Sequence, residues 1–403
     1  MKVAIKASTH MDSAASPLGS VEDRLIRIPA ELRIKLQLDT GVFLVFGGKD
    51  GSKIVLQTAP AYAKDIIVSE DCMYVSQTTK DLLQLEKSPV IKPANDVLIG
   101  CDPEFFLVDS STGFHISASH FFPHSGEVGN DCGLAELRPR PSYSAAGVVA
   151  ELRRLITQTA QHLEQRTWLR AKPIKLVAAS YWNNASAGFH VHFGLPANLL
   201  KASASNYTII RGLISILDYY VGITSVLPEG DEDALRRSER VSRYGKPGDY
   251  RADLRTLEYR VPGGHLLRHP ILTGGLMAVS IVTMKDALSR FAAYTDNFTR
   301  RVDDLAAYET IKGLYPTMPL KENLYKSLTN ESIKVPMTYM NLIFNDLTSM
   351  IGFDANRTEI LEYFNYLVEF IRGRTRINED ILTNWGITDE RQPRPLEVLR
   401  ASV

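Results

Sequence analysis

The chain of 403 residues contains little cysteine and no excess of charge of either sign. Its three cysteines, Cys72, Cys101 and Cys132, form no Cys-x-x-Cys pair and have no metal-ligand spacing. This odd, widely spaced set excludes a disulfide framework and favours a reducing compartment, so we expect a cytoplasmic protein. Lys+Arg and Asp+Glu both number 46. The resulting net charge of zero excludes attraction of the whole molecule to nucleic acid or membrane, which makes a nucleic-acid partner unlikely.

The sequence also lacks long uninterrupted hydrophobic runs and the common nucleotide motifs. The first residues, MKVAIKASTHMDSAASPLG, have no continuous apolar core, so we do not expect a signal peptide. The most apolar segments are 207–227, which carries Arg211 and Asp218, and 271–284, which is too short to span a bilayer. Both are interpreted as buried helices, and no membrane partner is expected. The chain has no phosphate-binding P-loop, no Gly-x-Gly-x-x-Gly after a strand and no serine-hydrolase elbow.

The remaining pattern predicts two domains. Residues 1–90 contain short strand-like runs such as VFLVFGG, SKIVLQ, DIIVS and CMYVS, separated by Gly and Asp turn signals. They indicate a small β-rich accessory domain. A proline-containing linker at 86–97 follows, and we assign 94–403 to a catalytic domain with a mainly helical C-terminal part. The expected fold class is α+β, with a largely antiparallel sheet and helices on one side.

Within the second domain, strands are predicted at 98–108, 134–138, 174–180, 188–194 and 255–261. The segment after Pro141 places Val148, Leu152, Leu155, Ile156 and Leu163 on one helical face. A polar, arginine-rich loop is expected at about 229–253, and a long helix at about 269–293.

Four of the predicted strands share one feature: each carries two ionisable side chains two residues apart, and therefore on the same face. The pairs are Asp102 and Glu104, Glu136 and Arg138, His190 and His192, and Glu258 and Arg260. One such pair is ordinary on the wet face of an antiparallel sheet. All four together contain only carboxylates, imidazoles and guanidinium groups, whereas a solvated face mixes Lys, Thr, Ser and Gln. We therefore expect the four strands to form a common site.

The chemistry of this set favours a hard divalent cation. Carboxylate oxygens predominate, with one or two imidazoles and no cysteine, which suits Mg²⁺ or Mn²⁺. Arginines beside such a cation indicate phosphate chemistry, in which the cations bridge nucleotide oxygens and neutralise charge as a phosphoryl group transfers. Arg243 and its neighbours in the arginine-rich loop are candidates to close on the phosphates. Asp131 is a candidate because GNDCGLAELRPRP runs from it directly into the second strand.

These motifs, in this order, resemble a known family. The DPEFF start, the ELRP strand, the His-x-His strand of SAGFHVHFGLP and the segment RTLEYRVPGGHLLRHP are similar to the phage phiEco32-like carboxylate–amine ligases. That family shares its fold with glutamine synthetase and the glutamate–cysteine ligases. The likeness covers about 98–275, and it implies a glutamine-synthetase-like catalytic domain. If the chain is phage-encoded, the compartment would be the host cytoplasm.

The resemblance implies an ATP-dependent ligase that forms an amide through an acyl phosphate, from a carboxylate substrate and an amine substrate. It assigns the metal to Glu104, Glu136 and Glu258, with Asp102 and His190 assisting, and places His192 near the ATP phosphates. Arg255 and Arg260 would hold the transferring phosphate or the substrate carboxylate. Arg138 is assigned to phosphate or substrate, and Asp131 is the candidate base. The glutamine synthetases have Glu at the position of Asp102. An aspartate side chain is shorter and reaches less far, so the resemblance leaves direct contact between Asp102 and the metal open.

Three other functions remain open at this point. A phosphotransferase of the guanidino-kinase type would use the same kind of sheet, and its product would be a phosphorylated nitrogen. A metal-dependent hydrolase would use His190 and His192 and would need no ATP. A binding protein that is not an enzyme would act through residues 1–90. The identity of both substrates and the oligomeric state are not determined by the sequence.

Overall fold

The computed structural model describes the following residues: 4–7, 25–32, 43–47, 53–61, 72–75, 80–81, 92–93, 97–165, 174–195, 200, 204–229, 231–241, 245–253, 256–293, 304–329, 334–375 and 377–387. The chain divides into two compact units. The first comprises Met1–Asp96 with Leu195–Lys201, and the second comprises Val97–Gly194 with Ala202–Val403. Each unit is described by itself below.

The first unit contains a six-stranded sheet in the order β1-β5-β2-β4-β3-β6. Its strands are β1 (Ala4–Ala7), β2 (Leu25–Ile28), β3 (Phe43–Gly47), β4 (Lys53–Pro60), β5 (Cys72–Val75) and β6 (Lys92–Pro93). Buried Ile26, Ile28 and Met73 contribute to its core. Strands therefore lie where the runs VFLVFGG, SKIVLQ and CMYVS predict them, whereas the DIIVS run lies outside the described residues.

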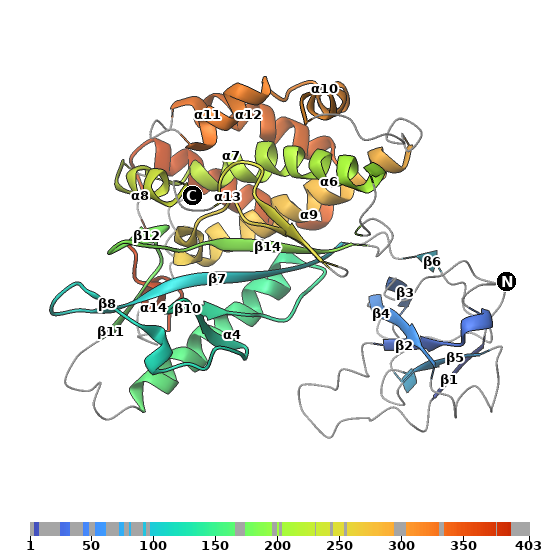
Figure 1. Ribbon diagram of the computed structural model, residues 1–403, viewed down its shortest axis with the longest axis horizontal. Coiled ribbons are helices and arrows are strands. Elements are labelled where there is room, and N and C mark those ends of the chain that lie inside the picture. The colour runs from blue at the N-terminus through green and yellow to red at the C-terminus, as the bar shows by residue number, and fades with distance from the viewer. Residues whose placement is uncertain are drawn as a thin grey trace. The chain divides into compact units, whose positions relative to one another are not determined.

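The second unit is built on an antiparallel sheet in which the central strand β7 (Leu98–Asp109) is the longest (Figure 1). The order is β15-β16-β14-β7-β10-β9, and β8 and β11 also pair with β7. All of these pairings are antiparallel. The other strands are β8 (His115–Ile116), β9 (Val128–Asp131), β10 (Leu134–Leu137), β11 (Ile174–Val177), β14 (Phe189–Gly194), β15 (Tyr250–Ala252) and β16 (Thr256–Tyr259), with a separate hairpin of β12 (Tyr181–Trp182) and β13 (Ala185–Ser186).

The alternation of side chains along β7 decides which face of the sheet becomes the core. Ile99, Cys101, Phe105 and Leu107 are apolar and buried, and they share one face, whereas Asp102 and Glu104 point to the other. The helix α4 (Ala145–Glu164) packs near β7 and β10. Its N-cap is Ser144, whose hydroxyl accepts a hydrogen bond from the Gly147 amide. The buried residues of α4 include all five that the helical periodicity predicts.

The helices of the second unit gather mainly in one layer around α9 (Figure 1). They are α6 (Ala204–Leu217), α7 (Ile223–Val226), α8 (Asp231–Val241), α9 (Pro270–Ala293), α10 (Asp304–Leu314), α11 (Lys321–Thr329), α12 (Lys334–Ser349), α13 (Arg357–Ile371) and α14 (Ile381–Asn384). A π-helical turn, Asp218–Gly222, joins α6 to α7. The α+β class and the largely antiparallel sheet are thus confirmed.

The prediction of a loop at about 229–253 is wrong. Residues Asp231–Val241 form the helix α8, and Tyr250–Ala252 form the strand β15. The acidic residues of the first turn favour the helix because they complement its dipole. Arg237 and Arg240 of the helix are buried rather than solvated: the first pairs with Glu229, and the second donates to the backbone carbonyls of 260–262. These long-range contacts make a polar segment part of the core.

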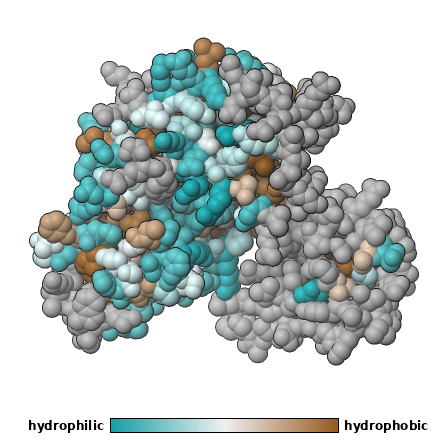
Figure 2. Space-filling model, viewed as in Figure 1, coloured by the Kyte–Doolittle hydropathy of each residue, from teal (hydrophilic) through white to brown (hydrophobic). Residues whose placement is uncertain are grey.

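Two helical segments, Tyr207–Val226 and Pro270–Arg290, are long and apolar enough by composition to cross a membrane. Their apolar windows are 83% and 89% buried within the protein, which is typical of core helices. The surface in Figure 2 is mostly hydrophilic over the second unit, with hydrophobic residues in small separate groups. Exposed large hydrophobic side chains, such as Phe114, Leu320 and Ile351, come from different parts of the chain.

Candidate metal and phosphate site

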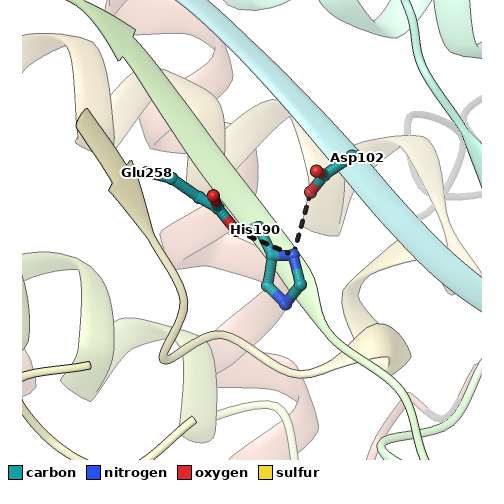
Figure 3. Close-up of side chains that lie close together, drawn as sticks. All are labelled: Asp102, His190 and Glu258. Carbon is teal, nitrogen blue, oxygen red and sulfur yellow. Dashed lines mark ion pairs between the residues drawn. The ribbon is translucent and has the colours of Figure 1, made fainter. Parts of the chain in front are cut away.

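Three ionisable side chains converge on the polar face of the sheet, each from a different strand (Figure 3). Asp102 of β7, His190 of β14 and Glu258 of β16 offer ligand atoms that all lie within 4.8 Å of one another. The strand register produces this meeting, because His190 lies opposite Asp102 and His192 lies opposite Glu258. No other such group occurs among the residues that the structure describes.

Asp102 lies between the two histidines. His190 Nδ1 is 3.0 Å from Oδ1, and His192 Nε2 is 2.9 Å from Oδ2. Burial alone would raise the pKa of Asp102, but the hydrogen bonds from His190 and His192 outweigh it and hold the pKa below its usual range. Burial would likewise lower the pKa of His192, but the bond to Asp102 raises it. The carboxylate is therefore held in its ionised form, ready to bind a cation.

Glu258 is 2% exposed and is surrounded by cationic groups. Arg251 Nε lies 2.6 Å from Oε2, Arg260 Nε lies 3.3 Å from Oε1, and His190 Nδ1 lies 3.5 Å from Oε1. Arg251 belongs to the arginine-rich segment whose side chains are candidates for the phosphates, but its contact with Glu258 is not predicted, because the segment is expected to be a loop. It sits on β15 directly opposite Glu258, and the two-residue spacing of Tyr250 and Ala252 around it could have indicated a strand.

Glu104 and Glu136 lie beside this group, on the same face of the sheet. They occupy directly opposite positions on β7 and β10 and are 6% and 7% exposed. Glu104 Oε2 accepts a hydrogen bond of 2.7 Å from the Gly188 amide. Burial, and then the charge of Asp102, raise the pKa of Glu136 to about 7. Neither glutamate belongs to the 4.8 Å group, so they form a second pair of carboxylates next to it.

Arg138 and Asp131 lie at the outer side of the sheet, around β10 and β9. Arg138 forms an ion pair with Glu136 and donates to the Gly126 carbonyl at 3.0 Å. The guanidinium lies across Gly129, where a Cβ atom would meet Arg138 Nη1 at 2.1 Å. Asp131 lies opposite Leu134, and therefore on the same face as Glu136, whose pKa its charge helps to raise.

Several arginines that the sequence suggested for phosphate binding have structural partners instead. Arg236 pairs with Glu232 and Glu379, and Arg237 and Arg240 are held as described above. Arg243 and Arg255 lie outside the described residues. Arg260 and Arg251 are therefore the arginines of the described structure that contact Glu258, and their side chains are 29% and 67% exposed.

The donor set fits a hard divalent cation. Two carboxylates and one imidazole converge, and two further buried carboxylates, Glu104 and Glu136, stand next to them. Facing carboxylates repel each other when both are ionised, so a bound cation would remove an unfavourable interaction. Because carboxylate oxygens outnumber imidazole nitrogens in this set, it suits Mg²⁺ or Mn²⁺ better than Zn²⁺.

Several solved structures are similar to this chain. A bifunctional glutathione synthetase from Pasteurella multocida is 10% identical, with 69% of this chain and 52% of that chain covered and a TM-score of 0.32. This chain thus spans about half the length of that enzyme. Apo GmaS is 11% identical (79% and 96% covered, TM-score 0.33), and a novel glutamine synthase homolog is 12% identical (85% and 81% covered, TM-score 0.33). TM-scores this low do not establish a shared fold, and we draw no conclusion from these matches.

The comparison by sequence is more informative. No curated protein matches the chain. The model of the family described as phage phiEco32-like COOH.NH2 ligase-type 2, however, matches residues 99–387, which include every described residue of the site. This match confirms the resemblance seen in the sequence motifs, and the chain belongs to this family of carboxylate–amine ligases.

Proposed function

We propose that this protein uses ATP and a divalent cation to join a carboxylate to an amine on the polar face of the sheet. The observation that carries the proposal is the convergence of Asp102, His190 and Glu258 from three strands. The membership of a carboxylate–amine ligase family supports the reaction class. Beyond the reaction class, we propose that the reaction uses ATP, Mg²⁺ or Mn²⁺, and an acyl phosphate intermediate.

The proposed reaction has two steps. In the first, the γ-phosphoryl group of ATP passes to a carboxylate oxygen, which releases ADP and gives an acyl phosphate. The amine, once it has lost a proton, attacks the acyl carbon, and inorganic phosphate leaves as the amide forms. The phosphorylation is needed because a carboxylate is a poor electrophile without a leaving group.

Asp102, His190 and Glu258 would hold the cation, with Glu104 and Glu136 beside them. The ligand atoms already lie close together: His190 Nδ1 is 3.0 Å from Asp102 Oδ1 and 3.5 Å from Glu258 Oε1. When bound, the cation supplies positive charge that neutralises phosphate oxygens during phosphoryl transfer. His192 keeps Asp102 oriented through its 2.9 Å contact.

Arg251 and Arg260 would bind the phosphate groups or the substrate carboxylate. Both lie against Glu258 and keep part of the side chain exposed, so their guanidinium groups can exchange this carboxylate for a phosphate once Glu258 holds a cation. Asp131 stays the candidate base for the amine, since it lies on the same face at the outer strand.

The test is turnover of the full chain with ATP, Mg²⁺ or Mn²⁺ and a panel of acids and amines. We expect ADP release that requires both substrates, with an amide product identified by mass spectrometry. Glu258→Gln should reduce the rate by at least about a hundredfold, because it removes a charged ligand without changing the shape of the side chain. The matched control is Glu322→Gln on α11, an exposed acid far along the chain, which should keep full activity.

Two results would contradict the proposal. A product that retains phosphorus on nitrogen would identify a phosphotransferase instead. Turnover without ATP that is highest with zinc would identify a hydrolase. A hydrolase of this kind would use both imidazoles on its metal, whereas the converging group contains one histidine, His190, and His192 contacts Asp102 instead.

A further inference from the structure

Tyr259 is the last residue of β16 and lies between Glu258 and Arg260, two residues of the metal and phosphate site. Because side chains alternate along a strand, Tyr259 points away from the polar face. Its side chain is completely buried, and its hydroxyl donates a hydrogen bond of 2.9 Å to Asp218 Oδ1. This bond connects the strand that carries Glu258 to the helical layer.

The Tyr259 hydroxyl meets both ends of the π-helical turn Asp218–Gly222. The turn joins α6 to α7 within the helical layer, and all of its residues are buried (Figure 1). Asp218 at one end accepts the hydrogen bond. Gly222 at the other end leaves room for the hydroxyl, because a Cβ atom there would lie 2.8 Å from its oxygen. π-helical turns are rare and are frequently found at functional sites, so this turn is a candidate for a functional role.

The same carboxyl group also holds the loop before β15. The backbone amide of Gly248 forms a hydrogen bond to Asp218. The next residue, Asp249, accepts a hydrogen bond of 2.8 Å from the Gly245 amide, and its Oδ1 lies 3.9 Å from Arg260 Nη1. The Arg260 amide in turn donates to the Asp249 carbonyl at 3.2 Å. Asp218 is thus joined both to the strand that leads into Arg260 and to the loop that faces its guanidinium.

A carboxyl group in this place is costly. Asp218 is 1% exposed, and burial raises its pKa to about 7, although the hydrogen bonds from Tyr259 and Gly248 lower it. An apolar residue would fill a similar volume of the core without this cost. Packing alone therefore does not account for Asp218, whereas its contacts with β16 and with the loop do.

We propose that Asp218 and Tyr259 are positioning residues that fix the places of Glu258 and Arg260 on the other face of the sheet. Both side chains are buried on the helical side, so they act through their neighbours and do not touch the cation or the phosphates. The anchor, which consists of Asp218, the Tyr259 hydroxyl and the Gly248 amide, is a feature of the fold. Its effect on ATP rests on the proposed function.

The test replaces Tyr259 with phenylalanine, which removes the hydroxyl and keeps the ring. Hydrogen exchange of the backbone amides in 245–253 and 256–260, without ATP or metal, should become about ten- to a hundredfold faster, because the strand and the loop lose their shared anchor. The affinity for Mn²⁺ should fall about threefold or more, and the KM for ATP should rise about tenfold, because displaced ligands and guanidinium groups bind less well. The kcat should change less than the KM.

Tyr315→Phe is the matched control. The Tyr315 hydroxyl also donates to a buried aspartate, Asp286, at 2.8 Å, but Asp286 belongs to α9 and Tyr315 follows α10. This variant should lose stability as well, but keep the parental exchange in the same two segments, the parental Mn²⁺ affinity and the parental KM. A purely structural loss lowers the fraction of folded enzyme, and therefore the apparent kcat rather than the KM.

Gly248→Ala tests the loop without a change to the buried hydroxyl or carboxyl group. Gly248 has a φ of +80°, and a Cβ atom there would lie 3.0 Å from the hydroxyl oxygen of Tyr325 on α11, so alanine should displace the loop. The KM for ATP should rise about three- to tenfold in this variant too.

Parental exchange rates in the Tyr259→Phe protein would overturn the proposal. So would faster exchange with parental Mn²⁺ affinity and KM, because the anchor would then have a structural role alone. If Tyr259→Phe does not fold, parental Mn²⁺ affinity and KM in Gly248→Ala would overturn it. Absence of turnover in the parent protein would contradict the proposed function instead, and exchange and Mn²⁺ affinity would still decide on the anchor.

Discussion

Glu104 of β7 and Glu136 of β10 lie directly opposite each other, and both are almost completely buried. Two ionised carboxylates in this position repel each other at close range. Arg138 offsets part of the repulsion from the side of Glu136, and the Gly188 amide binds Glu104. Without a cation, the repulsion within this pair therefore lowers the stability of the folded state, and the same charge favours binding of a cation. A substitution that removes one of the two charges should affect stability and metal binding in opposite directions.

Glu136→Gln should raise the midpoint of thermal unfolding, or leave it unchanged, when divalent metal is absent, because the repulsion is removed. The same variant should bind Mn²⁺ about tenfold more weakly and should lose most of the gain in stability that Mn²⁺ gives the parent protein. Thermal unfolding with and without MnCl₂ measures both effects. Glu322→Gln serves as the exposed control. A variant that is less stable without metal, and gains as much from Mn²⁺ as the parent, would show that Glu136 has a structural role.

Arg251 should affect ATP and metal in opposite ways. Its Nε atom binds Glu258 Oε2 at 2.6 Å, so in the absence of metal it competes for a metal ligand. Arg251→Ala should leave Mn²⁺ affinity unchanged or tighter, and raise the KM for ATP by about ten- to a hundredfold, the cost of a hydrogen bond to a charged group. Arg251→Lys should recover part of the loss. Equal losses for metal and ATP, measured by calorimetry and kinetics, would rule out this division of roles.

The face of the sheet that forms the site could be predicted from the sequence, but the contacts within it could not. Alternation with period two places both members of each pair on one face, whichever strands are neighbours. The register decides the rest: it places His190 opposite Asp102, and Glu136 opposite Glu104. The resemblance to the family makes Glu104 a main ligand, whereas the structure brings Asp102 into the converging group. The strands β7 and β14 pair although they lie far apart in the sequence, so local patterns do not show which residues come opposite each other.

The polar segment of α8 shows the other limit. Its composition is that of a solvated loop or surface helix, but Arg237 and Arg240 are 4% and 1% exposed. Their partners, Glu229 and the carbonyls of 260–262, are brought near only by the folded chain. A reading of the local sequence assigns arginine to the surface, because burial of a charged group is favourable only when such partners are present.

His269 should make the protein sensitive to acid. Burial, and then the charge of Arg153, lower the pKa of His269 to about 4 in the folded state, whereas the unfolded chain titrates near 6.5. Between these values the unfolded state binds a proton that the folded state does not. The free energy of unfolding should therefore fall, by about 1.4 kcal/mol per pH unit from this residue, as the pH drops from 6.5 towards 4.

Denaturant unfolding at several pH values between 7 and 4 checks this with the variant His269→Asn. In the parent, the Ile271 amide donates a hydrogen bond of 3.1 Å to His269 Nδ1 at the start of α9. Asparagine offers a side-chain oxygen as acceptor for the same amide, so the start of the helix is preserved. The stability of the variant should fall less steeply with acid than that of the parent. His120→Asn changes an exposed histidine and should keep the parental slope. Identical slopes for the parent and the His269 variant would contradict the prediction.

Gly275 and Gly313 are both helical glycines, and the same substitution should have opposite effects on them. In α9, a Cβ atom on Gly275 would lie 2.1 Å from Cγ of the fully buried Tyr363 ring on α13, whereas nothing lies within 4 Å of a Cβ atom on Gly313 in α10. Gly313→Ala should stabilise the protein by about 0.5–1 kcal/mol, because alanine favours the helix. Gly275→Ala should destabilise it by about 1–3 kcal/mol or more, because Tyr363 cannot move away without disturbing its 2.6 Å hydrogen bond to the Thr224 carbonyl. Chemical denaturation of the two variants measures both values, and stabilisation by Gly275→Ala would show that α9 and α13 pack less closely than described.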